Sequence, residues 1–178
     1  MSTDSRTAET WLVLRSQTGD REALDQLLRG IQDDLARYIA SLMSQSPDAP
    51  DALQEVLLKM VRKIGTLREP ALFRPWAFRI ASREAFAKLR AEKEWHRLID
   101  PDADTASISD GKNDDSIRDG IDVPRLIDKL SLASRTVVAL HYMEGLTHSE
   151  IATTLGLSVG TVKSRLAYGL TQLRKTAM

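Results

Sequence analysis

The stretch THSEIATTLGLSVGTVKSRL, from Thr147 to Leu166, has the pattern of two helices joined by a tight turn. Thr147 is followed three residues later by Glu150, which is the spacing of a capping box at the start of a helix. Gly156 suits the turn, because glycine adopts a positive φ at little cost. Ser158 is a suitable cap for the second helix. The pattern therefore predicts a helix-turn-helix.

Apolar residues recur in this stretch at helical spacing and predict the buried side of both helices, with the small Ala152 where they cross. These apolar residues are Ile151, Leu155, Leu157, Val159, Val162 and Leu166. Short polar and basic side chains remain on the outer side: Ser158, Thr161, Lys163, Ser164 and Arg165. Such side chains suit the DNA major groove and its phosphates, so they are candidate DNA-binding residues. The alternative is an ordinary helical hairpin with a solvated basic face.

Charge is unevenly distributed along the chain, although 25 basic and 25 acidic residues give a net charge of zero. Residues 1–95 hold 15 Lys and Arg against 14 Asp and Glu, and residues 122–178 hold 7 against 4. Residues 96–121 hold 3 against 7. The acidic middle cancels the basic C-terminal part, so the zero net charge does not argue against binding to nucleic acid.

Composition excludes several classes of protein. The absence of cysteine excludes disulfides and thiolate metal sites. The opening MSTDSRTAET lacks a basic start followed by an apolar run, so it does not resemble a secretory signal. No apolar run approaches the roughly 20 residues that a membrane-spanning helix needs. We therefore expect a soluble, cytoplasmic protein without membrane insertion.

Helical periodicity also dominates the first half of the chain. Apolar residues from Leu24 to Leu42 recur at steps of three and four, and a second stripe runs from Leu53 to Ile64. Asp51 is the expected cap of the second helix. Residues 66–75 contain two prolines and predict a loop, and a third helix is expected from about Trp76.

The periodicity disappears between residues 96 and 121, a segment rich in Asp, Ser and Gly that cannot bury much apolar surface. It returns with short helices expected over residues 123–130 and 133–144. The predicted fold class is all-α. Two small helical domains, residues 1–95 and 122–178, are joined by a flexible acidic linker, and the C-terminal domain contains the helix-turn-helix.

Several segments resemble the sigma-70 family of bacterial RNA polymerase sigma factors, specifically the extracytoplasmic-function type. GDREALDQLL (19–28), DALQEVLLKM (51–60) and FRPWAFRIASREAFAKLR (73–90) follow the order and spacing of that family, and residues 130–175 resemble its final domain. The resemblance implies a promoter-specificity subunit that binds core RNA polymerase, opens the −10 region of promoter DNA and reads the −35 region with the helix that starts at Ser158.

The resemblance also implies roles for individual side chains. In the family, the DALQE helix docks on the clamp helices of the β′ subunit, and the final domain meets the flap of the β subunit. The implied polymerase-binding residues are Asp51, Gln54, Glu55 and Lys59. Basic side chains that would hold the opened −10 strand are Arg68, Arg74, Arg79, Arg83, Lys88 and Arg90, and Phe73 would stack on an extruded base. Trp76 would anchor its helix in the core.

Two features depart from the family or admit a second interpretation. Arg83 and Ala87 stand where many members carry an Asn and an Asp, so base readout is not assigned to them and Arg83 favours a phosphate contact. In related factors the linker threads the channel of polymerase that later takes RNA, and the seven Asp residues of 96–121 suit such a path. A plain solvated tether is the alternative.

Other functions find less support in the sequence. Asp100, Asp102 and Asp104 lack the Gly and Glu positions of a calcium loop, and the three histidines have no ligand spacing, so we expect no metal, cofactor, small-molecule substrate or catalytic residue. The rival interpretations are a free-standing helix-turn-helix regulator and a sigma-like decoy that binds an anti-sigma factor. Regulation by an anti-sigma protein is expected for the sigma factor itself.

Overall fold

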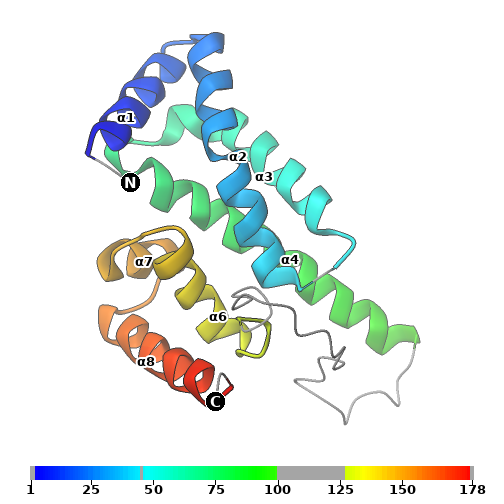
Figure 1. Ribbon diagram of the computed structural model, residues 1–178. Coiled ribbons are helices and arrows are strands. Elements are labelled where there is room, and N and C mark those ends of the chain that lie inside the picture. Colours follow the sequence, from blue (N-terminus) through cyan, green and yellow to red (C-terminus); the bar gives the residue numbers. More distant parts are fainter. Residues whose placement is uncertain (1–2, 45, 100–126, 177–178) are drawn as a thin grey trace, which may run out of the picture.

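The computed structural model describes residues 3–44, 46–99 and 127–176, and within these ranges the chain is helical with no β-strand. The N-terminal unit holds α1 (Thr3–Gln17), α2 (Arg21–Met43), α3 (Ala49–Lys63), the 3-10 turns η1 (Ile64–Thr66) and η2 (Pro70–Leu72), and α4 (Phe73–Ile99). The C-terminal unit holds α6 (Leu132–Val138), the π-helical turn η4 (Ala139–Met143), α7 (His148–Leu155) and α8 (Val159–Thr176) (Figure 1). The predicted all-α fold class is confirmed, whereas most of the predicted linker lies outside the described residues.

The long helix α2 lies at the centre of the N-terminal unit and packs against α1, α3 and α4. Asp20 caps it by accepting a hydrogen bond of 3.0 Å from the backbone N–H of Ala23. This bond, together with a second one from Arg15, lowers the pKa of the Asp20 carboxyl. The predicted apolar stripe is confirmed, with these members buried: Leu27, Ile31, Leu35, Tyr38, Ile39 and Leu42.

Two predicted helix starts are wrong by two or three residues. α3 begins at Ala49 with Asp48 at its N-cap, so Asp51 lies in the first turn and does not cap the helix. α4 begins at Phe73 and includes Trp76 in its first turn. Prolines explain both errors, because a proline that breaks a helix interior fits well in a first turn, where its missing N–H has no intrahelical partner to bond.

Two further differences concern the existence of α1 and the end of α4. α1 was not predicted, because its apolar residues are consecutive (Trp11 to Leu14) and show no helical spacing. Val13, which is fully buried in the shared core, holds α1 in place by tertiary packing. α4 continues to Ile99, past residue 95, where the first domain was expected to end.

The helix-turn-helix of the C-terminal unit forms as predicted. Thr147 and Glu150 make a complete capping box, and Gly156 ends α7 with a φ of 68°. Of the apolar residues expected in the core, Ile151, Val162 and Leu166 are buried, and Leu155 and Leu157 are half-buried. Val159 is exposed, contrary to the prediction. A helical side chain normally lies over the turn that precedes it, and Val159, as the first residue of α8, has no such turn to pack against.

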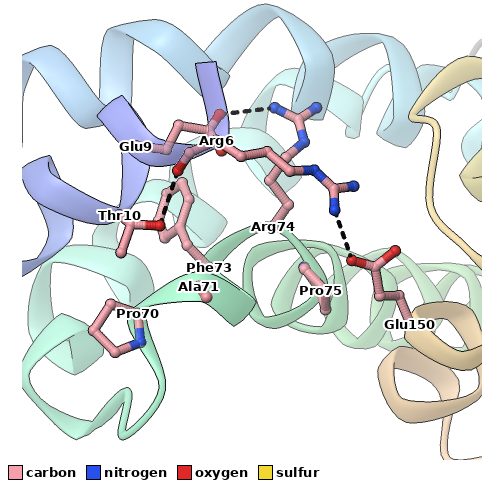
Figure 2. A pocket seen from close by; sticks show the side chains of 9 residues that line it. All are labelled: Arg6, Glu9, Thr10, Pro70, Ala71, Phe73, Arg74, Pro75 and Glu150. Atoms are coloured by element: carbon pink, nitrogen blue, oxygen red, sulfur yellow. Dashed lines mark hydrogen bonds and ion pairs between the residues drawn. The ribbon is translucent and has the colours of Figure 1, made fainter. Parts of the chain in front are cut away.

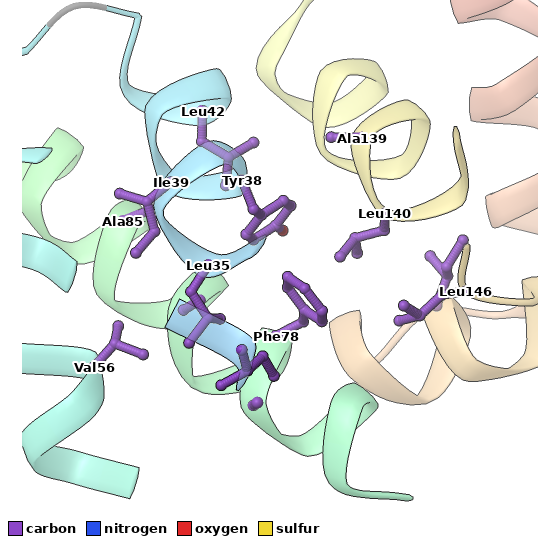
Figure 3. Packing of buried hydrophobic residues seen from close by; sticks show 14 of the residues in the cluster. Leu35, Tyr38, Ile39, Leu42, Val56, Phe78, Ala85, Ala139, Leu140 and Leu146 are labelled. Atoms are coloured by element: carbon purple, nitrogen blue, oxygen red, sulfur yellow. The ribbon is translucent and has the colours of Figure 1, made fainter. Parts of the chain in front are cut away.

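The two units share one apolar core, which Figure 3 shows from close by. Tyr38 of α2 and Phe78 of α4 meet edge to face with ring centroids 5.2 Å apart, and Leu140 and Leu146 of the C-terminal unit lie beside them. The hydroxyl groups of Tyr38 and Ser82 are 2.7 Å apart and hydrogen-bonded. The C-terminal unit is therefore packed onto the N-terminal unit through buried side chains as well as through surface contacts.

Candidate polymerase and promoter interfaces

One side of α3 is exposed and combines acidic, amide and apolar groups. We call it the α3 face; its residues are Asp51, Gln54, Glu55, Leu58, Val61 and Arg62. Asp51, Gln54 and Glu55 are exposed, and Lys59, whose side chain is 39% exposed, forms an ion pair through its Nζ with Glu84 of α4. Leu58 and Val61 are 42% and 43% exposed and were missed. The sequence does indicate them, because Leu58 and Val61 are apolar residues that fall outside the periodicity of the buried stripe.

The first two turns of α8 carry the predicted DNA-binding side chains. Lys163 and Ser164 are exposed, and Thr161 and Arg165 are half-buried. The Ser158 hydroxyl accepts a hydrogen bond of 3.0 Å from the Thr161 N–H, so Ser158 acts as a cap. The hydroxyl of Ser164 donates to the Thr161 carbonyl at 3.0 Å. Lys163 and Arg165 therefore supply the positive charge of this surface.

The basic residues predicted to contact the −10 strand fall into separate environments. Arg68, Arg83 and Arg90 are exposed, and Arg79 and Lys88 are half-buried. Arg79 donates a hydrogen bond of 2.8 Å to the carbonyl of Thr153 in α7. A groove of about 280 Å³ runs between α4 and the end of α7 and is lined by Arg79, Ser82, Arg83, Phe86 and residues 153–156. In this conformation, part of the basic side of α4 therefore faces the C-terminal unit.

Arg74 is placed differently: it is buried within a cluster of charges where both units meet. Its guanidinium lies 3.1 Å from Glu9 Oε1, 2.6 Å from Asp34 Oδ2 and 3.5 Å from Glu144 Oε2. It also lies over the ring of Phe78, 5.6 Å from the centroid. Burial works against the charge of Arg74, but the hydrogen bond with Asp34 and the charge of Glu9 outweigh it and raise the pKa.

Figure 2 shows two ion pairs beside this cluster of charges. Arg6 of α1 pairs with Glu150 of α7 at 3.3 Å, and Glu9 of α1 pairs with Arg74. The small cavity there measures about 10 Å³, roughly the space of one water molecule. Phe73 lies in its wall and is only 2% exposed. The place is therefore a packed junction between three helices and has no room for a ligand.

The chain matches known proteins over both units. The profile Sigma-70 region 2 matches residues 27–94, and Sigma-70, region 4 matches residues 121–173. The RNA polymerase sigma-H factor of Pseudomonas aeruginosa is 32% identical over 166 residues, which cover 87% of this chain and 86% of that protein. The ECF RNA polymerase sigma factor SigM of Mycobacterium tuberculosis is 32% identical over 157 residues, covering 88% and 78%.

The chain belongs to the extracytoplasmic-function sigma factors of the sigma-70 family. Solved structures show the same fold. CnrH in complex with the cytosolic domain of CnrY aligns with a TM-score of 0.70 at 22% identity, covering 96% of this chain and 97% of that one. The sigma factor RpoE in complex with the anti-sigma factor NepR from Bartonella quintana aligns with a TM-score of 0.69 at 23% identity, covering 85% and 94%.

The sigma factor directs transcription, and the interpretation as a free-standing regulator is not favoured. Two residues expected at the opened DNA are not available in this conformation. Phe73 is packed in the core and presents no ring to a base, and Arg74 is held by three carboxylates. Sequence reasoning placed both at the DNA because their positions follow the family order. Arg74 is held instead by Glu9 and Glu144, which are distant in sequence, and Phe73 belongs to the shared apolar core.

Sigma factors are transcription initiation factors, and the matched regions cover most of both helical units, with α1 outside them. Within the part of the chain that the structure describes, none of the helices combines the length and apolar character needed to cross a bilayer.

Proposed function

We propose that the sigma factor docks on the clamp helices of core RNA polymerase through the α3 face and meets the β-subunit flap with its C-terminal unit. The observation that carries this proposal is the presence in one chain of an exposed acidic and apolar face on α3 and an exposed basic face on α8. Apolar groups beside charged ones suit a protein partner, whereas Lys163 and Arg165 suit DNA phosphates. The residues proposed for docking are Asp51, Gln54, Glu55 and Lys59, together with Leu58 and Val61 further along the helix.

Promoter DNA is the second proposed partner. The first turns of α8 would read the −35 region through Ser158, Thr161, Lys163, Ser164 and Arg165. The exposed side chains of Arg68, Arg83 and Arg90 and the half-buried Lys88 would hold the backbone of the opened −10 strand, joined by Arg79 after the groove between α4 and α7 widens. RNA synthesis belongs to polymerase, so the sigma factor would have no enzymatic activity of its own.

Regulation and location follow the same proposal. RpoE was solved with an anti-sigma factor, and we propose that a protein of that kind also covers the binding faces of this sigma factor. The sigma factor would act in the cytoplasm, at the nucleoid when bound to polymerase. The two domains would extend over about residues 1–99 and 122–178, since α4 continues to Ile99.

Purified core polymerase tests the proposal directly. With the sigma factor added, we expect transcripts that start at a small set of defined sites in a library of genomic fragments, and no such transcripts from core alone. Start-site mapping by sequencing the 5′ ends of the transcripts is the measurement. A sigma factor that neither binds core nor produces defined starts would contradict the proposal.

Replacing Gln54 and Glu55 together by alanine is expected to weaken binding to core polymerase at least about tenfold, because an interface loses polar contacts near its centre. Affinity would be measured by fluorescence titration of labelled sigma factor with core. The free energy of unfolding should stay within about 0.5 kcal/mol of the parent, since both side chains are exposed.

The matched control is the double change Gln32→Ala with Asp33→Ala on α2, an adjacent amide and acid that are equally exposed. It should leave the affinity for core unchanged. Equal loss of affinity in both double variants would mean that the α3 face has no special role in docking.

A further inference from the structure

We propose that the free sigma factor is held in a closed conformation by a latch of four charged side chains, two of them buried and two half-buried, and that this latch opens as the pH rises. The latch consists of Arg74, Glu9, Asp34 and Glu144. It joins α1, α2 and α4 of the N-terminal unit to the end of the π-helical turn in the C-terminal unit. The significance of opening for DNA rests on the proposed function, but the latch itself does not.

The closed conformation covers side chains that the proposed function needs. Arg74 is 8% exposed and both of its terminal nitrogens bond to carboxylates, and Arg79 is bonded to the Thr153 carbonyl. The hydroxyl of Thr154 donates a hydrogen bond of 3.2 Å to the carbonyl of Pro75, at the start of α4. The beginning of α4, the helix proposed to hold the opened −10 strand, is therefore in contact with the helix-turn-helix along two turns, and DNA cannot reach it there.

The latch contains an excess of negative charge when every carboxylate is ionised. Three carboxylates meet Arg74, and Arg37 is a second cation that pairs with Asp34 at 2.5 Å. Three negative and two positive charges leave one negative charge in excess, and Glu144 is the carboxylate with the least access to water. Protonation of one carboxyl removes that imbalance.

Glu144 is the carboxyl best placed to carry this proton. Its side chain is 1% exposed, and its Oε1 has no hydrogen-bond partner among the described residues. The other groups that face it are Asp34, Arg37 and Tyr38 of α2, Glu9 of α1 and Arg74 of α4. Burial holds the Tyr38 hydroxyl neutral by raising its pKa, so Tyr38 adds no charge. On the same segment, His141 hydrogen-bonds through Nδ1 with the Leu146 carbonyl at 2.9 Å.

Burial, reinforced by the charge of Asp34, raises the pKa of Glu144 to about 7, although Arg74 and Arg37 act in the opposite direction. Opening exposes Glu144 to water, where its pKa falls toward the ordinary value of 4.5. The closed conformation therefore binds an extra proton between these two values. Its stability relative to the open one is greatest below pH 4.5 and falls as the pH rises to about 7.

Distance measurements on the free protein test the latch. The sequence has no cysteine, so Thr66→Cys and Ala167→Cys introduce one labelling site in each unit at exposed positions. Single-molecule fluorescence energy transfer, without polymerase or DNA, would count closed and open molecules. We expect the ratio of open to closed molecules to rise on the order of tenfold from pH 5.5 to pH 8.

Glu144→Gln keeps the shape of the side chain and cannot ionise, so this variant should stay closed and lose the pH response. Glu22→Gln, at an exposed carboxylate of α2 that does not face the C-terminal unit, should keep the full response. The glutamine variant also shows whether Glu144 or a histidine causes the pH response, because histidine is a residue type that changes charge between pH 5 and 8.

Three results would overturn the latch: no open molecules at pH 8, an open fraction independent of pH, or an unchanged pH response in Glu144→Gln. Because polymerase and DNA are absent, opening with rising pH in a chain that starts no transcripts would reject the proposed function and leave the latch in place. Defined transcripts from a chain that never opens at pH 8 would reject the latch and leave the proposed function in place.

Discussion

Replacing Phe78 by alanine is expected to lower the free energy of unfolding by about 3–5 kcal/mol. The ring is fully buried, packs edge to face on Tyr38 and lies under the guanidinium of Arg74. Its removal leaves a cavity at the place where the two units share their core, so both units should lose stability together. Urea unfolding followed by circular dichroism is the measurement.

Tyr168→Ala is the control for this change, because Tyr168 is an aromatic residue of α8 that is 57% exposed. It should alter the free energy of unfolding by no more than about 0.5 kcal/mol. If Phe78→Ala lowered the free energy of unfolding as little as this control, the conclusion that the two units share one core would be wrong. A second unfolding transition in the parent would also contradict it, since a shared core makes the units unfold cooperatively.

Replacing Lys163 or Arg165 by alanine is expected to weaken promoter binding by the assembled holoenzyme roughly tenfold each at about 0.1 M salt. Each change would remove one proposed phosphate contact of α8, so fewer counterions would be released when DNA binds. The slope of log K against log salt should therefore become shallower by about 0.9 for each residue. Binding to a promoter fragment at several salt concentrations measures both quantities.

Arg29→Ala provides the matched control, because it removes the same charge from an exposed position of α2, with a side chain that is 78% exposed. Neither the affinity nor the salt slope should change. Unchanged binding in both α8 variants would mean that the reading face of α8 is wrongly placed. A loss of affinity with an unchanged salt slope would mean that these side chains act other than through phosphates.

Local patterns were sufficient to predict most of the helices. The stripe of α2, the capping box at Thr147 and the turn at Gly156 all depend on residues within about one turn of each other, so they can be read from the sequence alone. The same approach missed α1, whose helix depends on burial of Val13 against other elements. It also misplaced the starts of α3 and α4, where first-turn prolines resemble breaks.

Gly169 illustrates a position whose role only packing explains. A glycine inside a helix costs stability, and nothing in the neighbouring sequence accounts for one in α8. In the structure, a Cβ at this position would lie 2.9 Å from Cγ2 of Val138 in α6. The glycine therefore permits the close approach of two helices about 30 residues apart in the chain.

The amino-acid sequence by itself determined the helical fold class, the helix-turn-helix and the kind of residues offered to polymerase and DNA, because these depend on spacing along one helix. Only the tertiary structure decided which of those residues are accessible. Arg74 and Phe73 belong to a segment that resembles a DNA-binding one, yet both are buried. The reason is that distant segments meet: Glu9 and Glu144, 135 positions apart in sequence, converge on Arg74 when the two units pack together, and Phe73 packs into the shared apolar core.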